Sequence, residues 1–154
     1  MLFRSETRSF TFMAEGNIAK QGDFSIPVRV YYEDTDCGGV VYYANYLKFM
    51  ERARTEWLRT RGFEQDRLST QERVIFAVRA IKVDFLRPGR FNDLLEATVN
   101  VRRIGGASLT FLQEIQRKTT TLCQAEVRVA CLDAQSFAPR AIPNHIVSQL
   151  GKVN

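Results

Sequence analysis

The stretch from residue 34 to residue 46 holds the residue types best suited to chemistry. It reads DTDCGGVVYYANY and places Asp36 and two glycines between a strand-like run and an amphipathic run. Where a strand turns into a helix, the first N–H groups of the helix lack intrahelical acceptors and the helix dipole is positive. Such a junction can stabilise a developing oxyanion. Asp36, beside it, is therefore a candidate base or nucleophile.

The polar residues of this stretch can also have purely structural roles. An aspartate before glycines often only accepts a hydrogen bond in an Asx turn, and Asp34 is expected to have such a structural role. Cys37 suggests a thiol nucleophile, but the single histidine, His145, lies far along the sequence, after Pro143. Because a thiolate needs an activating partner, Cys37 is interpreted as a small turn residue and His145 as a surface or packing residue.

The cysteines and the single histidine do not indicate a disulfide framework or a metal site. Cys123 and Cys131 fall on one predicted strand, roughly 26 Å apart at about 3.3 Å per residue, which is too far for a disulfide. No Cys-x-x-Cys motif occurs, so a conventional zinc site is not expected. The pattern predicts a reducing, cytoplasmic location and no metal or redox cofactor.

Length and composition indicate one soluble domain. The chain has 154 residues, of which 45 % are hydrophobic and 25 % charged, and no apolar run approaches the roughly 20 residues of a membrane span. The net charge of +5 is spread along the sequence, which suits an anionic ligand such as a nucleotide phosphate better than a nucleic acid. We expect a mobile tail over 1–24, one domain over 25–145 and a C-terminal tail over 146–154.

A pattern of alternating polarity precedes the site, and a helical pattern of apolar residues follows it. Residues 26–33 (IPVRVYYE) alternate in polarity and predict a half-exposed strand. From Tyr43 onward, apolar residues recur at spacings of three and four, which predicts a helix of about four to five turns. Gly62 suits a left-handed cap and is expected to end this helix. The polar run 64–72 is predicted to be a loop.

The rest of the chain has strand patterns separated by turn residues. The predicted strands cover residues 74–85, 94–104, 108–118 and 121–133. Short connections between the last three require antiparallel pairing, and the one long helix must pack on the concave face of the sheet to bury its apolar side. The prediction is an α+β fold with a five-stranded sheet, whose exposed edge favours edge-to-edge dimerisation.

Two segments carry a resemblance to a known family. The runs over residues 28–59 and 83–115, with the string D-x-D-x-x-G-V-V-Y-x-x-N-Y, resemble the hotdog-fold acyl-CoA thioesterases. The resemblance is strongest to the YbgC-type enzymes associated with the Tol-Pal system, relatives of 4-hydroxybenzoyl-CoA thioesterase, and covers about residues 27–142. It implies a helix wrapped by an antiparallel sheet, and dimers or a homotetramer (a dimer of dimers) with active sites between subunits.

The resemblance also implies roles for individual residues. Asp36 matches the catalytic carboxylate, and the backbone N–H of Tyr43 matches the group that polarises the thioester carbonyl. Where YbgC-type enzymes commonly have histidine this chain has Tyr43, so an auxiliary imidazole is absent and substrate preference cannot be transferred. The implied substrate-binding residues are Gly39, Val40 and Asn45 around the acyl group, and Arg102 and Arg103 at the CoA phosphates. The alternative for the two arginines is a solvated hairpin tip. Arg87 and Arg90 are weaker phosphate candidates.

These observations predict an acyl-CoA thioesterase that uses Asp36 as base or nucleophile and needs no cofactor. Glu51, on the predicted helix, is the second candidate carboxylate. The expected partners are acyl-CoA and further copies of the chain, with no nucleic acid and a possible peripheral link to inner-membrane Tol-Pal components or an acyl-carrier protein. The alternative is a non-catalytic acyl- or protein-binding module of the Tol-Pal machinery. Acyl-chain preference, and CoA versus carrier-protein thioesters, stay open.

Overall fold

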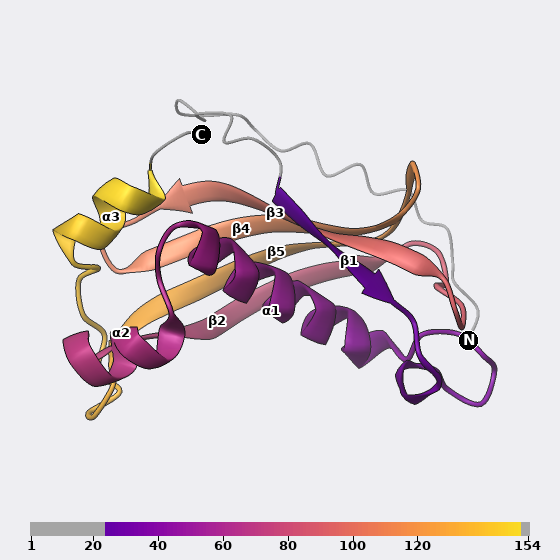
Figure 1. The fold of residues 1–154 in the computed structure, drawn as a ribbon, viewed down its shortest axis with the longest axis horizontal. Coiled ribbons are helices and arrows are strands. Elements are labelled where there is room, and N and C mark those ends of the chain that lie inside the picture. The colour runs from indigo at the N-terminus through magenta and orange to yellow at the C-terminus, as the bar shows by residue number, and fades with distance from the viewer. Residues whose placement is uncertain (1–23, 152–154) are drawn as a thin grey trace.

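Five strands form one antiparallel sheet in the order β1-β3-β4-β5-β2 (Figure 1). The computed structural model describes residues 24–151. The strands are β1 (Phe24–Arg29), β2 (Val74–Phe85), β3 (Leu94–Ile104), β4 (Ser108–Arg117) and β5 (Thr120–Asp133). The four later strands match the predicted ranges to within one residue, because alternating side chains and turn residues mark them clearly. The α+β prediction is confirmed.

Helix α1 (Tyr43–Thr60) lies against one face of the sheet and packs on β1, β3 and β4 (Figure 1). Its 18 residues make five turns, as predicted. Gly62 follows with φ +87°, the left-handed conformation expected at the helix end. The buried residues of α1 are Asn45, Tyr46, Phe49, Met50, Ala53, Arg54, Trp57 and Leu58. The apolar stripe therefore also takes in an asparagine and an arginine.

The first strand is shorter than the prediction of 26–33. Val30 is fully buried beside β1, but Tyr32 is 77 % exposed and begins a 3-10 turn, η1 (Tyr32–Asp34). The carboxylate of Asp34 accepts the N–H of Tyr31 at 2.8 Å, which favours the turn over a longer strand. Asp34 and Asp36 consequently do not share one strand face, and Asp34 has the structural role that was expected.

Two further segments differ from the prediction. Residues 64–72, expected as a loop, contain helix α2 (Gln65–Glu72), which Leu68 anchors to the core with 3 % exposure. Helix α3 (Asn144–Leu150) buries Ile146 and Leu150 completely, so the packed chain continues past the predicted boundary at residue 145. Of the predicted N-terminal tail, only Phe24 belongs to the described residues, and it begins β1.

Strand β2 forms an edge of the sheet, and the middle of its length is exposed. Val78 is 47 % exposed and Ile81 36 %, and both belong to a run of exposed positions between residues 78 and 82. Its outer backbone groups have no neighbouring strand among residues 24–151. No helix within these residues has the length and hydropathy needed to cross a membrane.

Candidate active site

The turn that carries Asp36 is a tight hairpin running from Asp36 to Val40. The N–H of Asp36 donates to the carbonyl of Val40 at 2.9 Å, and the N–H of Gly39 donates to the carbonyl of Asp36 at 3.0 Å. Gly39 has φ +75°, a conformation that favours glycine. Asp36 is exposed, and its Oδ1 accepts the N–H of Gly38 at 2.8 Å. This Asx turn fixes the carboxylate, while Oδ2 accepts no hydrogen bond from the described residues.

Helix α1 begins directly after this hairpin, and its first N–H group is available. Tyr43 is the first helical residue, and its N–H donates to no acceptor within residues 24–151. Two contacts set the start of the helix: the carbonyl of Asp34 accepts both the N–H of Tyr42 and the side-chain Nδ2 of Asn45, each at 2.9 Å. Asn45 is buried, with 7 % exposure, so it positions the helix start. An open N–H and the positive end of the helix dipole therefore directly follow the hairpin that carries the Asp36 carboxylate.

Aromatic side chains surround this helix start and stay accessible. Tyr42 and Tyr43 are 48 % and 47 % exposed, and the Tyr43 ring packs edge-on against Phe85 at 5.8 Å between centroids. Exposed aromatic rings at the helix start provide an accessible apolar surface. The phenol of Tyr43 occupies the place for which the resemblance predicts an imidazole.

The loop between β2 and β3 holds the hairpin from the other side. The N–H of Val41 donates to the carbonyl of Gly89 at 2.8 Å, and the N–H of Phe91 donates to the carbonyl of Gly39 at 3.3 Å. Val40 and Arg90 form an isolated antiparallel bridge between these contacts. The sequence predicts a turn and two weaker phosphate candidates, Arg87 and Arg90, in this loop, so its contacts with the hairpin were not predicted.

The three thiols are free and none has a histidine partner. Cys123 and Cys131 are fully buried, and burial raises the pKa of the Cys123 thiol to about 12. Cys37 is exposed in the hairpin. His145 instead contacts Glu72 at 2.9 Å, near the C-terminal end of α2 and away from the start of α1. The geometry supports no thiol–imidazole pair.

For the thioester hydrolysis that the resemblance implies, replacing Cys37 with alanine is therefore expected to leave the rate essentially unchanged. The side chain contributes no hydrogen bond to the hairpin, and the backbone contacts of Asp36 and Gly39 do not depend on it. Steady-state kinetics with one acyl-CoA, together with a thermal melt, checks this. A collapse of turnover in a folded variant would identify Cys37 as the nucleophile.

The predicted phosphate contacts lie far from Asp36 within one chain. Arg102 pairs with Glu126 at 2.6 Å, and Arg103 is exposed near the end of β3. Leu94, at the start of that strand, adjoins the loop that holds the hairpin, and eight or nine residues at about 3.3 Å each separate it from the two arginines by about 26–30 Å. The weaker candidates Arg87 and Arg90 are exposed on the loop itself.

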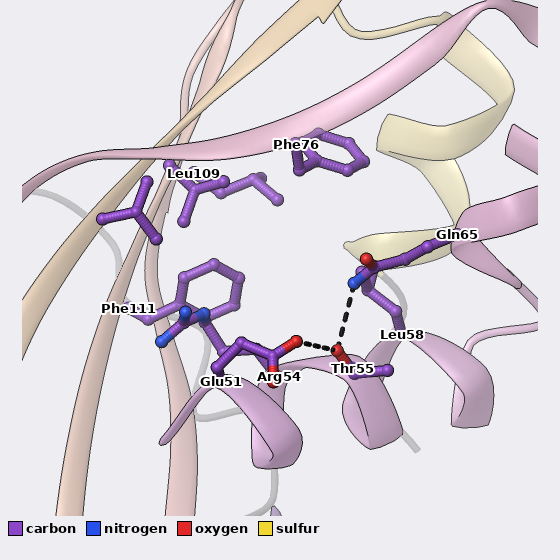
Figure 2. A pocket seen from close by; sticks show the side chains of 10 residues that line it. Glu51, Arg54, Thr55, Leu58, Gln65, Phe76, Leu109 and Phe111 are labelled. Atoms are coloured by element: carbon purple, nitrogen blue, oxygen red, sulfur yellow. Dashed lines mark hydrogen bonds between the residues drawn. The ribbon is translucent and has the colours of Figure 1, made fainter. Parts of the chain in front are cut away.

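A cleft of about 100 Å³ opens between α1, α2 and the sheet (Figure 2). One wall is polar: the hydroxyl of Thr55 donates to Glu51 at 3.0 Å and accepts from Gln65 at 3.2 Å. The opposite wall is apolar and includes Phe76 and Phe111, whose rings Figure 2 shows at the cleft. Glu51 follows Tyr43 by eight residues, about 12 Å along the helix, so this second carboxylate lies apart from the open N–H.

Comparisons with known proteins agree with this geometry. A family model described as the thioesterase superfamily matches residues 38–124. The "Acyl-CoA thioesterase YbgC" of Haemophilus influenzae is 46 % identical over 123 residues, covering 80 % of this chain and 90 % of the relative. The "Acyl-CoA thioester hydrolase YbgC" of Escherichia coli O157:H7 is 49 % identical over 127 residues, covering 82 % and 94 %. The crystal structure of a probable thioesterase from Bartonella henselae superposes with a TM-score of 0.76 at 35 % identity, covering 79 % of this chain and 100 % of that one.

Proposed function

The chain belongs to the thioesterase superfamily and hydrolyses acyl-CoA thioesters, and from that premise we propose that Asp36 and the N–H of Tyr43 form its catalytic site. One observation carries the proposal: a carboxylate with one oxygen fixed by the turn and one oxygen open belongs to the hairpin that leads directly into the first, unpaired N–H of a long helix. A carboxylate and an oxyanion donor are what thioester hydrolysis requires.

The proposed reaction needs no cofactor. Oδ2 of Asp36 removes a proton from water as the water oxygen attacks the thioester carbonyl carbon, or Oδ2 attacks that carbon itself and water then hydrolyses the resulting anhydride. The N–H of Tyr43 and the α1 dipole stabilise the oxyanion. The C–S bond breaks, CoA leaves as thiolate, and the thiolate takes up a proton. A thiol of ordinary pKa is a good leaving group, so the missing imidazole is not required as an acid.

The test of this function is release of CoA thiol from a panel of acyl-CoAs that spans short alkyl, long alkyl and aryl groups. Exposed aromatic rings at the helix start support acceptance of an apolar or aryl acyl group. Turnover of at least one member of the panel is expected. If the purified chain binds acyl-CoAs but hydrolyses none of them, the alternative of a non-catalytic acyl-binding module gains support.

We propose that Arg102 and Arg103 bind the CoA phosphates at the active site of another protomer, because within one chain they lie at the far end of β3. Replacing Arg103 with glutamate is expected to raise KM for acyl-CoA about tenfold with little change in kcat, since a phosphate contact contributes equally to the ground and transition states. Arg103 is the cleaner site for this change, because Arg102 already pairs with Glu126.

Two controls make this prediction specific. An acyl-pantetheine lacks the nucleotide phosphates and should be hydrolysed equally by the variant and the wild type. Arg67→Glu changes the net charge by the same amount on the exposed side of α2 and should leave KM unchanged. If Arg90→Glu raises KM and Arg103→Glu does not, the phosphates bind to the loop beside Asp36 in the same protomer.

We further propose that the active assembly is a dimer or a dimer of dimers. The exposed middle of β2 and the open helix start both need a neighbour's surface to cover them, and a second copy is the simplest source. Light scattering should give the mass of a dimer or tetramer at assay concentration. A monomer with full activity would contradict a site completed between subunits.

The cytoplasmic location is a proposal that rests on the cysteine pattern, and a peripheral link to inner-membrane Tol-Pal components or an acyl-carrier protein is a proposal that rests on the sequence resemblance. Comparing hydrolysis of an acyl-CoA with that of the same acyl group on an acyl-carrier protein tests whether a carrier-protein thioester is a substrate. Equal kcat/KM for the two substrates would favour the carrier protein as a physiological donor, and a strong preference for acyl-CoA would argue against it.

A further inference from the structure

The relative position of Asp36 and the Tyr43 N–H depends on a segment that belongs to neither. The hairpin is exposed. Beyond its own turn and the contact of Asn45 with the Asp34 carbonyl before it, the hairpin is held by the loop between β2 and β3 through Gly39, Val41 and the bridge at Val40. Those contacts set the place of Asp36 only if the loop is itself fixed relative to helix α1. Among residues 24–151, a side-chain hydrogen bond between α1 and the loop does this.

That contact is made by the hydroxyl of Tyr46, which accepts the N–H of Gly89 at 2.9 Å. Tyr46 lies one turn into α1, three residues after Tyr43, and is only 3 % exposed. Burial is the main cause that raises the pKa of its phenol, so the hydroxyl stays protonated and neutral. The carbonyl of the same Gly89 accepts the N–H of Val41. One glycine thus connects the helix to the hairpin through its two backbone polar groups.

The fit around Gly89 is tight for a side chain. A Cβ there would lie 3.1 Å from Cγ2 of Val41 and 3.2 Å from the hydroxyl of Tyr46, tighter than ordinary van der Waals contact. The loop is also held on its other side: Arg117 donates to Asp93 at 2.8 Å, and the same carboxylate oxygen accepts the N–H of Arg90 at 2.9 Å. Loop, helix and hairpin therefore pack as one unit.

We propose that Tyr46 is a positioning residue for hydrolysis: its hydroxyl, through Gly89 and Val41, holds the Asp36 hairpin at the distance from the Tyr43 N–H that the reaction needs. The inference rests on the proposed function of Asp36. A displacement of a catalytic group by about 1 Å can cost about a hundredfold in rate, so a contact that fixes this distance matters although it touches no substrate.

The test begins with Tyr46→Phe, which removes the hydroxyl and keeps the ring packed against Phe49 and Phe85. We expect kcat to fall about tenfold while KM for the acyl-CoA changes little, because the substrate contacts are kept. Gly89→Ala should produce a similar loss by pushing the loop away from Tyr46 and Val41. The double variant should be no worse than the poorer single variant, because both changes break one contact. Tyr32→Phe removes a phenol on an exposed ring and should keep wild-type kcat.

A second background separates positioning from general destabilisation. In Asp36→Asn, Tyr46→Phe should cause no further loss, because the carboxylate that it positions is already gone. Wild-type kcat in both folded single variants, or an equal further loss in the Asp36→Asn background, would overturn the inference and leave the role of Asp36 intact. Wild-type activity of Asp36→Asn alone would instead reject the proposed function, and the positioning role with it. Circular dichroism of every variant identifies any loss caused by unfolding, and a folded Gly89→Ala keeps the test decisive if Tyr46→Phe unfolds.

Discussion

Replacing Asp36 with asparagine is expected to lower kcat by about 10²- to 10⁴-fold, the usual contribution of a general base, with the fold and substrate binding retained. The amide oxygen of asparagine can still accept the N–H of Gly38, so the Asx turn should persist. What is lost is the open oxygen, since an amide neither takes up a proton at neutral pH nor attacks a thioester. Steady-state kinetics with the best acyl-CoA, and a binding measurement with CoA, check the two parts of this expectation.

The matched control is Asp34→Asn, the same chemical change two residues earlier. Asp34 accepts the N–H of Tyr31 through its side chain, a contact that an amide oxygen can also make, so this variant should keep most of its activity. Hydrolysis by Asp36→Asn within a few-fold of the wild type would show that Asp36 is neither base nor nucleophile.

Replacing Gln113 with alanine is expected to cause the largest loss of stability, about 3 kcal/mol or more in the free energy of unfolding. Gln113 is 1 % exposed, and its Oε1 accepts Nη1 of the buried Arg54 at 2.8 Å. Its Nε2 donates to the carbonyls of Met50 and Thr98, at 3.0 Å and 3.1 Å. Removing the amide leaves a buried cation and two buried carbonyls without this partner. Burial already lowers the pKa of Arg54, which shows how poorly solvated its charge is.

Urea unfolding of Gln113→Ala and of the wild type measures this loss of stability. Gln116→Ala is the control, because Gln116 is on the same strand but only half-buried and bonds to the side chain of Glu114. Gln116→Ala should lower the free energy of unfolding much less than Gln113→Ala. Equal midpoints for Gln113→Ala and the wild type would show that the buried amide does not neutralise the cost of burying Arg54.

The regular part of the fold could be predicted because its signals are local. Alternating side chains and the pair Gly105–Gly106 mark β3 and β4, and three- and four-residue spacing marks α1. Helix α2 was missed because it is polar and buries one apolar side chain, Leu68, so its sequence looks like that of a loop. The predicted first strand was too long because the turn at Asp34 depends on its own side chain and not on periodicity.

The contacts of the candidate site could be predicted only in part, for a different reason. The hairpin and helix start around Asp36 and Tyr43 are continuous in sequence, so their residues could be found together. The contacts that hold them are not: Gly89 lies 43 residues from Tyr46, and Gln113 lies 59 residues from Arg54. Both pairs consist of polar groups buried between elements, and no local pattern indicates which buried polar group meets which.

Catalysis by Asp36 and the Tyr43 N–H requires the thioester carbonyl to bind between the hairpin and the start of α1. A crystal structure of Asp36→Asn with a CoA thioether that keeps the acyl carbonyl but cannot be hydrolysed tests this most directly. The carbonyl oxygen should lie about 3 Å from the N of Tyr43, with the side chain of residue 36 facing the carbonyl carbon. A carbonyl bound instead in the cleft beside Glu51, out of reach of Tyr43, would contradict this placement and move catalysis to the other carboxylate.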